Sequence, residues 1–154
     1  MANVRHMVPG DVDAVLIMGQ AVIAESPRYC DKGFDEAKLR QMFDNMLGRE
    51  DHGFFVCEDG GGRLIGMALG FLVPYFFSAE LYAADLVIYV APENRGSSAA
   101  LRLVKSFEDW AFGNGAREVV LGVSTGINTA QAVCVYEKLG YKMVAHSLTK
   151  QRES

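Results

Sequence analysis

Three apolar, strand-like segments follow one another between residues 53 and 90, with no helix-like segment between them. They span 53–58, 63–73 and 79–90, and a glycine-rich turn and a proline separate them. Strands joined by such short connections pair antiparallel, so this part of the chain predicts a three-stranded meander. The meander constrains the fold most, because every other segment has to pack around it.

Further segments with helix or strand periodicity surround the meander: strands at 3–7, 118–123 and 141–148, and helices at 12–26, 34–47, from about 97 to 112, and from 128 or 129 to 139. After the meander in the sequence, a helix lies between two strands. Two strands joined in this way pair parallel through a right-handed connection. We therefore expect a single-domain α/β fold, called α+β in some schemes. Its central, mixed and twisted sheet would have about six strands, flanked by about four helices.

The composition favours one compact globular domain over residues 1–154. Half of the residues are hydrophobic and 22% are charged, which is ordinary for a folded domain. A formal net charge of −4 with no basic patch in the linear sequence argues against a nucleic-acid-binding module. Glycine and proline interrupt the longest apolar runs, and the N-terminus lacks a signal-peptide pattern. We therefore expect a cytoplasmic protein that does not bind a membrane.

The cysteines and histidines do not form a recognisable metal site or disulfide framework. Cys30, Cys57 and Cys134 are odd in number and widely spaced, which favours reduced, mostly buried thiols. The three histidines are scattered without ligand spacing. No metal is expected.

The stretch VAPENRGSSAALRLV, residues 90–104, joins the meander to the next helix. A helix N-terminus presents unpaired backbone N–H groups and the positive end of the helix dipole, and a nearby glycine lets these amides wrap around an anion. Arg95 adds a permanent charge, and Ser97 and Ser98 add hydroxyls. A diphosphate suits this arrangement best, although a capped helix after a proline turn has the same composition.

Two motifs resemble the signatures of the GNAT N-acetyltransferases. IYVAPENRGSSAALRLV, residues 88–104, resembles their strand, proline turn and Q/R-x-x-G-x-G/A helix start, and AVCVYEKLGYK, residues 132–142, resembles their Tyr-Glu-Lys-Leu-Gly-Phe/Tyr helix end. The order of elements along nearly the whole chain also fits that family. The resemblance implies an acyltransferase that uses acetyl-CoA as co-substrate and acetylates a primary amine by direct attack in a ternary complex.

The resemblance also implies which residues bind acetyl-CoA: Arg95, Gly96, Ser97, Ser98, Ala99 and Ala100 at its pyrophosphate, and Ile88, Tyr89 and Val90 along its pantetheine arm. Ser98 stands where the family usually has glycine, so its Cβ narrows the approach and restricts φ. Asn128 lies one residue from the place of a family asparagine. It is either a cofactor ligand or the N-cap of a helix.

Catalytic roles follow from the same resemblance. Tyr136 matches the tyrosine that the family often uses as general acid toward the departing CoA thiolate, although a core-facing aromatic residue fits the same position. Glu80 and Asp85 are candidates for the general base; the alternative for each is a solvated or salt-bridged carboxylate. Glu25 and Tyr29 lie near the loop after the first helix, where family members often contact the acceptor. The aromatic segment 73–77 is either a wall of the acceptor pocket, part of the core or a dimer contact.

Other functions remain open at this stage. The chain is alternatively a catalytically weak or inactive acyl-CoA-binding or interaction module of the same fold, or a transferase of longer acyl groups. The acceptor is the amine of either a small molecule or a protein, and the acidic charge balance favours a basic one. A homodimer is one of the oligomeric states that the sequence leaves open.

Overall fold

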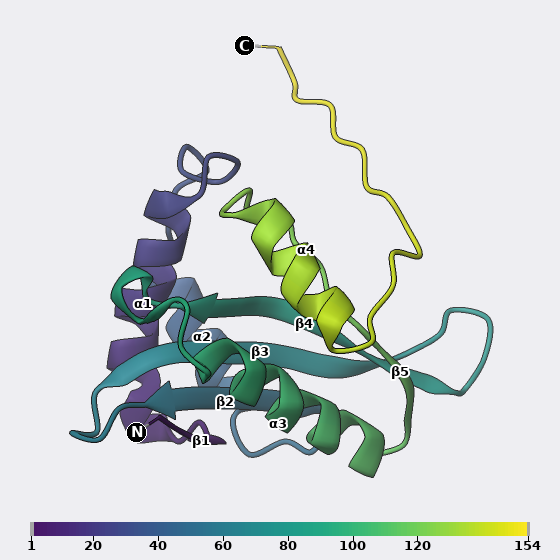
Figure 1. Cartoon of the computed structure of the whole chain (residues 1–154), viewed down its shortest axis with the longest axis horizontal. Helices are drawn as coiled ribbons and strands as arrows, with labels where there is room; N and C mark the ends of the chain where they lie inside the picture. Colours follow the sequence, from purple (N-terminus) through teal and green to yellow (C-terminus); the bar gives the residue numbers. More distant parts are fainter. Residues whose placement is uncertain (1, 154) are drawn as a thin grey trace.

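The computed structural model describes residues 2–153, which form one five-stranded sheet in the order β1-β2-β3-β4-β5 (Figure 1). The strands are β1 (Asn3–His6), β2 (His52–Glu58), β3 (Leu64–Pro74), β4 (Leu81–Val90) and β5 (Ala116–Val120). The first four pair antiparallel, and β4 pairs parallel with β5. The sheet is therefore mixed, as the meander and the strand–helix–strand unit predict.

Four α-helices accompany the sheet: α1 (Val12–Glu25), α2 (Glu36–Met46), α3 (Ala99–Gly113) and α4 (Thr129–Lys138). Two short 3₁₀-helices, η1 (Pro9–Asp11) and η2 (Pro92–Asn94), precede α1 and α3. Figure 1 shows α3 on one face of the sheet and α1 and α2 on the other. The predicted α/β fold and its helices are confirmed.

The predicted last strand, 141–148, does not form. Residues 142–153 are exposed and leave the body after α4 as an extended tail (Figure 1). Val144 and Leu148 are 70% and 97% exposed, so their apolar alternation does not reflect a buried face. Alternation describes how side chains point, but a strand also needs a neighbour for its backbone hydrogen bonds. The sheet has five strands rather than about six.

The central strands are buried on both faces. Phe54 and Val56 of β2 pack in the cluster with α1 and α2, while Phe55 and Cys57 pack in the cluster with α3. This two-sided burial explains why the sequence there is continuously apolar. Cys57 is buried, but Cys30 and Cys134 are exposed. The expectation of mostly buried thiols is therefore wrong, because two of the cysteines lie outside both clusters.

Two glycines allow α3 to lie close against the sheet. Gly53 of β2 and Gly70 of β3 are register partners, and the rings of Trp110 and Phe107 cover them. A Cβ at Gly53 would lie 2.4 Å from a Trp110 ring carbon, and one at Gly70 would lie 2.4 Å from the Ala84 carbonyl oxygen. Glycine is thus required by space, and the close approach fixes α3 and the loop before it.

We expect Gly70→Ala to lower the free energy of unfolding by about 2–3 kcal/mol, because the added methyl group would clash with both the Ala84 carbonyl oxygen and the Phe107 ring of α3. Urea unfolding followed by circular dichroism measures the change. Gly113→Ala is the control, since a Cβ there meets no atom within 4 Å. Equal unfolding midpoints for Gly70→Ala and the parent protein would contradict the close packing of α3.

Candidate active site

Strands β4 and β5 pair over a short stretch and then diverge. The last paired residues are Ala84 and Val120. At the next residue of β4, Oδ1 of Asp85 accepts a hydrogen bond from the backbone N–H of Gly122 at 2.9 Å. A side-chain carboxylate thus takes the place of the next rung of the ladder. Beyond it a cleft of about 590 Å³ opens.

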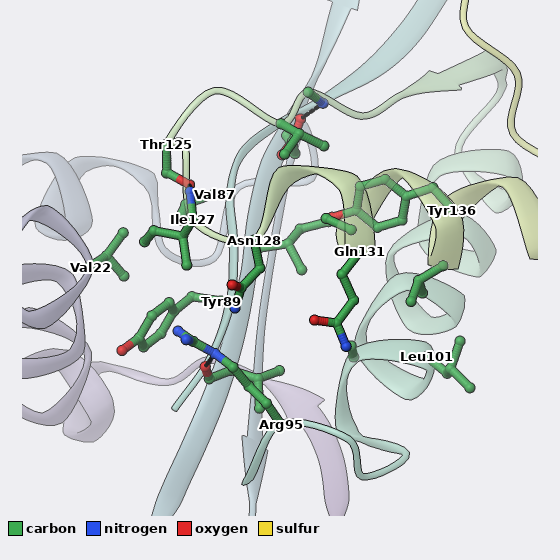
Figure 2. A pocket seen from close by; sticks show the side chains of 18 of the residues that line it. Val22, Val87, Tyr89, Arg95, Leu101, Thr125, Ile127, Asn128, Gln131 and Tyr136 are labelled. Atoms are coloured by element: carbon green, nitrogen blue, oxygen red, sulfur yellow. Dashed lines mark hydrogen bonds between the residues drawn. The ribbon is translucent and has the colours of Figure 1, made fainter. Parts of the chain in front are cut away.

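The cleft lies between the second half of β4, the loop before α3, and the segment from β5 into α4 (Figure 2). Most of the predicted cofactor-binding residues line it: Ile88, Tyr89, Val90, Arg95, Gly96, Ser97, Ala100 and Asn128. Two do not. Ala99 is fully buried against the core, and Ser98 is exposed at the N-cap of α3.

The loop before α3 offers backbone donors to the cleft. In the described part of the chain, the N–H groups of Gly96, Ser98, Ala100 and Leu101 have no hydrogen-bond acceptor. The left-handed residue of this loop is Gly96, with φ of 88°. Ser98 has φ of −77° and ψ of 0°, which any residue adopts, so a serine at this position is not strained. Of these residues, Gly96, Ala100 and Leu101 line the cleft, so three free donors at a helix N-terminus suit an anion there.

The guanidinium of Arg95 is already hydrogen-bonded to other groups of the protein. Its Nη1 and Nη2 donate to the two carboxylate oxygens of Glu25 at 2.6 and 2.9 Å, and its Nε donates to the Val90 carbonyl at 2.9 Å. The guanidinium also lies over the Tyr89 ring, 5.3 Å from the centroid. Hydrogen bonds from Arg95 hold the pKa of Glu25 below its ordinary value. Arg95 therefore fastens the loop to the end of α1, and Glu25 balances its charge.

The end of α1 also binds the loop on the opposite side of the cleft, between β5 and α4. Ser26 is fully buried, and its hydroxyl donates to the carbonyl of Thr125. Arg28 donates to the carbonyl of Ser124 at 3.2 Å. The backbone N–H of Tyr29 donates to the Ser26 hydroxyl at 3.1 Å. The last turn of α1 and the residues after it thus fix both loops that border the cleft.

Two of the predicted catalytic residues, Asp85 and Tyr136, line the cleft together. Burial raises the pKa of Asp85 to about 6, although the hydrogen bond from Gly122 works in the opposite direction. Burial and then the charge of Asp85 raise the pKa of Tyr136 to about 12. In Figure 2 the Tyr136 hydroxyl points from α4 into the cleft. A carboxylate and a protonated phenol, both half-buried, therefore line one cleft.

The other predicted base lies elsewhere. Glu80 precedes β4, and its exposed side chain lies 3.9 Å from Nη1 of Arg117. Among the aromatic residues of the β3–β4 loop, Phe76 and Phe77 are 99% and 71% exposed. None of these side chains lines the cleft. Of the two candidate bases, the fold brings only Asp85 to the cleft.

Sequence reasoning missed the side of the cleft formed by residues 122–125, Ile127 and Gln131. Asn128 has a left-handed backbone with φ of 47° and makes no side-chain cap hydrogen bond. Figure 2 shows the side chains of Asn128 and Gln131 pointing into the cleft. The left-handed turn at Asn128, a residue type that tolerates this conformation, is the signal that could have indicated this side.

A second cavity, of about 800 Å³, lies between α1, α2 and strands β3 and β4. It shares Val22, Leu86 and Val87 with the cleft. Leu86 is the extra residue of a β-bulge, because Val87 pairs with Leu69 while Asp85 pairs with Gly70. The bulge therefore stands where the two cavities meet.

The structure adds two observations on metals and membranes. Within residues 2–153, histidine, cysteine, aspartate and glutamate side chains form no group that could hold a metal ion. No helix in this same range has the length and apolar character needed to cross a membrane.

Comparison with known families gives a match over most of the chain. Residues 20–141 match the family model described as the acetyltransferase (GNAT) family. No curated protein sequence matches the chain.

Solved structures share the fold along the whole length. Glucosamine-6-phosphate N-acetyltransferase from Arabidopsis thaliana has a TM-score of 0.78 at 15% identity, with 99% of each chain covered. A putative acetyltransferase from Pyrococcus furiosus has a TM-score of 0.76 at 21% identity, covering 99% of this chain and 100% of its own. AAC(6')-Iy, in complex with the bisubstrate analog CoA-S-monomethyl-acetylneamine, has a TM-score of 0.77 at 17% identity, covering 100% of this chain and 99% of its own. Identities this low establish the fold alone.

The pairing of Arg95 with Glu25 gives a testable expectation. Arg95→Ala and Glu25→Ala should each lower the free energy of unfolding, and the double variant should lose less than the sum. We expect a coupling energy of about 1 kcal/mol, because the two side chains hold one ion pair. Urea unfolding of the four proteins measures it. Additive losses would mean that the pair does not fasten the loop to α1.

Proposed function

The chain belongs to the GNAT acetyltransferase family, which uses acetyl-CoA, and on that premise we propose that residues 1–154 act as an N-acetyltransferase domain for the primary amine of a small molecule. The observation that carries the proposal is the cleft between β4 and β5, with free amides along one wall and Asp85 and Tyr136 where the strands part. The amine attacks directly, in a ternary complex.

The residues of the cleft fit acetyl-CoA. Acetyl-CoA would supply the acetyl thioester, and the free N–H groups at 96–101 would hold its pyrophosphate. Val87, Ile88 and Tyr89 lie beyond the last pairing with β5, so their outer backbone groups can bind the pantetheine arm as an added strand. Arg95 positions the loop through Glu25, and the phosphate oxygens receive backbone hydrogen bonds.

Asp85 is the proposed general base. With a pKa of about 6 it is ionised at neutral pH, yet it takes up a proton more readily than an exposed carboxylate. It accepts one proton from the ammonium form of the substrate and so frees the nitrogen lone pair for attack on the thioester carbonyl carbon.

Tyr136 is the proposed general acid. Its pKa of about 12 keeps the phenol protonated throughout the physiological range. As the new C–N bond forms and the C–S bond breaks, the phenol gives its proton to the leaving sulfur. The second proton lost by the attacking nitrogen then restores the phenol. The products are the amide and the free thiol.

Gly96→Ala tests the cofactor loop. We expect it to weaken acetyl-CoA binding by about tenfold, because a Cβ strains the left-handed turn that aims the amides. Isothermal titration measures the dissociation constant. Gly62→Ala is a matched control: it also has a positive φ, of 83° against 88°, with nothing within 4 Å in either case, but it lies in the β2–β3 turn. Absence of acetyl-CoA binding to the parent protein would overturn the proposed function.

The pH dependence of kcat/KM tests Asp85. Because a base must be deprotonated to act, we expect kcat/KM of the parent protein to fall about tenfold per pH unit below pH about 6. This decrease is the acid limb of the profile. Asp85→Asn should lose the acid limb and should lower kcat/KM by about 10²-fold. Tyr136→Phe should keep the limb and lower the plateau, while Glu80→Gln should change neither. An acid limb that persists in Asp85→Asn would assign the base to another group.

A further inference from the structure

The second cavity has an apolar floor. Val15, Leu16, Phe43, Met67 and Leu69 line it, and each is at most 4% exposed. Phe34, Leu39 and Met42 complete the walls from the α1–α2 loop and α2. A space of about 800 Å³ with such a lining is in the range of sites for drug-sized apolar ligands.

The charged residues of this cavity are confined to its rim. Lys32, Asp35, Glu36 and Lys38 are all exposed. Three of them already have protein partners: Lys32 binds Asp31 at 2.7 Å, Asp35 caps α2 at the N–H of Lys38, and Glu36 binds Arg40. No charged side chain is buried among the floor residues to match a polycation or a phosphate. Burying an unmatched charge there would cost more than the site returns.

The cavity adjoins the cleft at the β4 bulge. Val22, Leu86 and Val87 line both spaces, and Leu86 directly follows Asp85 in β4. The exposed rim residues Lys32, Asp35, Glu36 and Lys38 do not line the cleft that fits acetyl-CoA. A molecule bound in this cavity would therefore lie beside the cleft, next to the bulge.

We propose that this cavity binds the body of the acceptor, and that the acceptor is an arylalkylamine: a monoamine whose single primary amino group is carried by an apolar, aromatic body. The inference rests on the proposed function, from which it takes the reaction at the amino group. The rings of Phe34 and Phe43 and the thioethers of Met42 and Met67 favour an aryl body over a polar one. The amino group lies at the junction, where Asp85 takes its proton.

Gly19 provides a variant that fills the cavity without breaking the fold. It lies in α1 and lines the cavity, and a Cβ there would lie 3.6 Å from the Phe34 ring, an ordinary contact. Gly19→Leu therefore extends into the space, and leucine is the better helix former. Ala21→Leu is the control, because Ala21 is exposed on the same helix and lines neither cavity. Met42→Phe narrows the same space from α2, should Gly19→Leu not fold.

The experiment compares 2-phenylethylamine with ethanolamine, spermidine and glucosamine 6-phosphate as acceptors at saturating acetyl-CoA. We expect kcat/KM for 2-phenylethylamine to exceed that for each of the others by about 10²-fold. Gly19→Leu should raise the KM for 2-phenylethylamine by about tenfold and leave the KM for acetyl-CoA unchanged. Ala21→Leu should change neither.

Several results would overturn the inference. One is better turnover of a polar, polycationic or phosphorylated amine. Another is a preference for octanoyl-CoA over acetyl-CoA that Gly19→Leu abolishes, which would assign the cavity to an acyl chain. If no amine is acetylated, titration of 2-phenylethylamine into protein saturated with CoA decides. Binding that Gly19→Leu removes would uphold the cavity while the transfer proposal fails, and absence of binding would overturn the inference itself.

Discussion

The hydrogen bond from Gly122 to Asp85 ends the pairing of β4 with β5, and the rest of the site depends on this end. If the ladder continued, β5 would cover the backbone of β4 and no cleft would exist. A carboxylate can terminate the ladder because it accepts the hydrogen bond and offers no donor in return. Its burial at this point is also the cause of its raised pKa. One residue thus shapes the cleft and has the acid–base character that its proposed role as general base requires.

Where β4 and β5 separate, the loops beyond them need other contacts to hold them in place. The end of α1 supplies these contacts. Glu25 binds the loop before α3 through Arg95, while Ser26 binds the loop before α4 at Thr125. One turn earlier, Val22 lines both cavities. The helix that lines the second cavity is therefore also the helix whose end binds both loops that border the cleft. The two binding regions share one support.

Sequence patterns predicted the fold because strand and helix periods are local, and short connections leave few ways to pair the strands. The family resemblance indicated Tyr136, and Asp85 was one of two candidate bases; the fold brings both side chains to the cleft. Sequence patterns could not anticipate that Arg95 pairs with Glu25, since the partners lie 70 residues apart and no local pattern links them. Residues 141–148 alternate between apolar and polar side chains as a strand does, but this alternation does not reveal whether a neighbouring strand is available for pairing. The bulge at Leu86, where the two cavities meet, has no periodic signature in the sequence.

The two glycines under α3, Gly53 and Gly70, limit which substitutions the sequence can accept during evolution. Gly53 and Trp110 fill one volume, and Gly70 and Phe107 fill the next. Enlarging a glycine alone produces a clash, and shrinking a ring alone leaves a void. The atoms nearest a Cβ at Gly53 all belong to the Trp110 ring, so a larger residue there is tolerated only together with a smaller one on the helix. At Gly70 the backbone carbonyl oxygen of Ala84 also blocks a Cβ, and a smaller residue at position 107 does not remove that clash. Gly53 and Trp110 therefore behave as one inherited unit, whereas Gly70 is fixed by the backbone of the neighbouring strand.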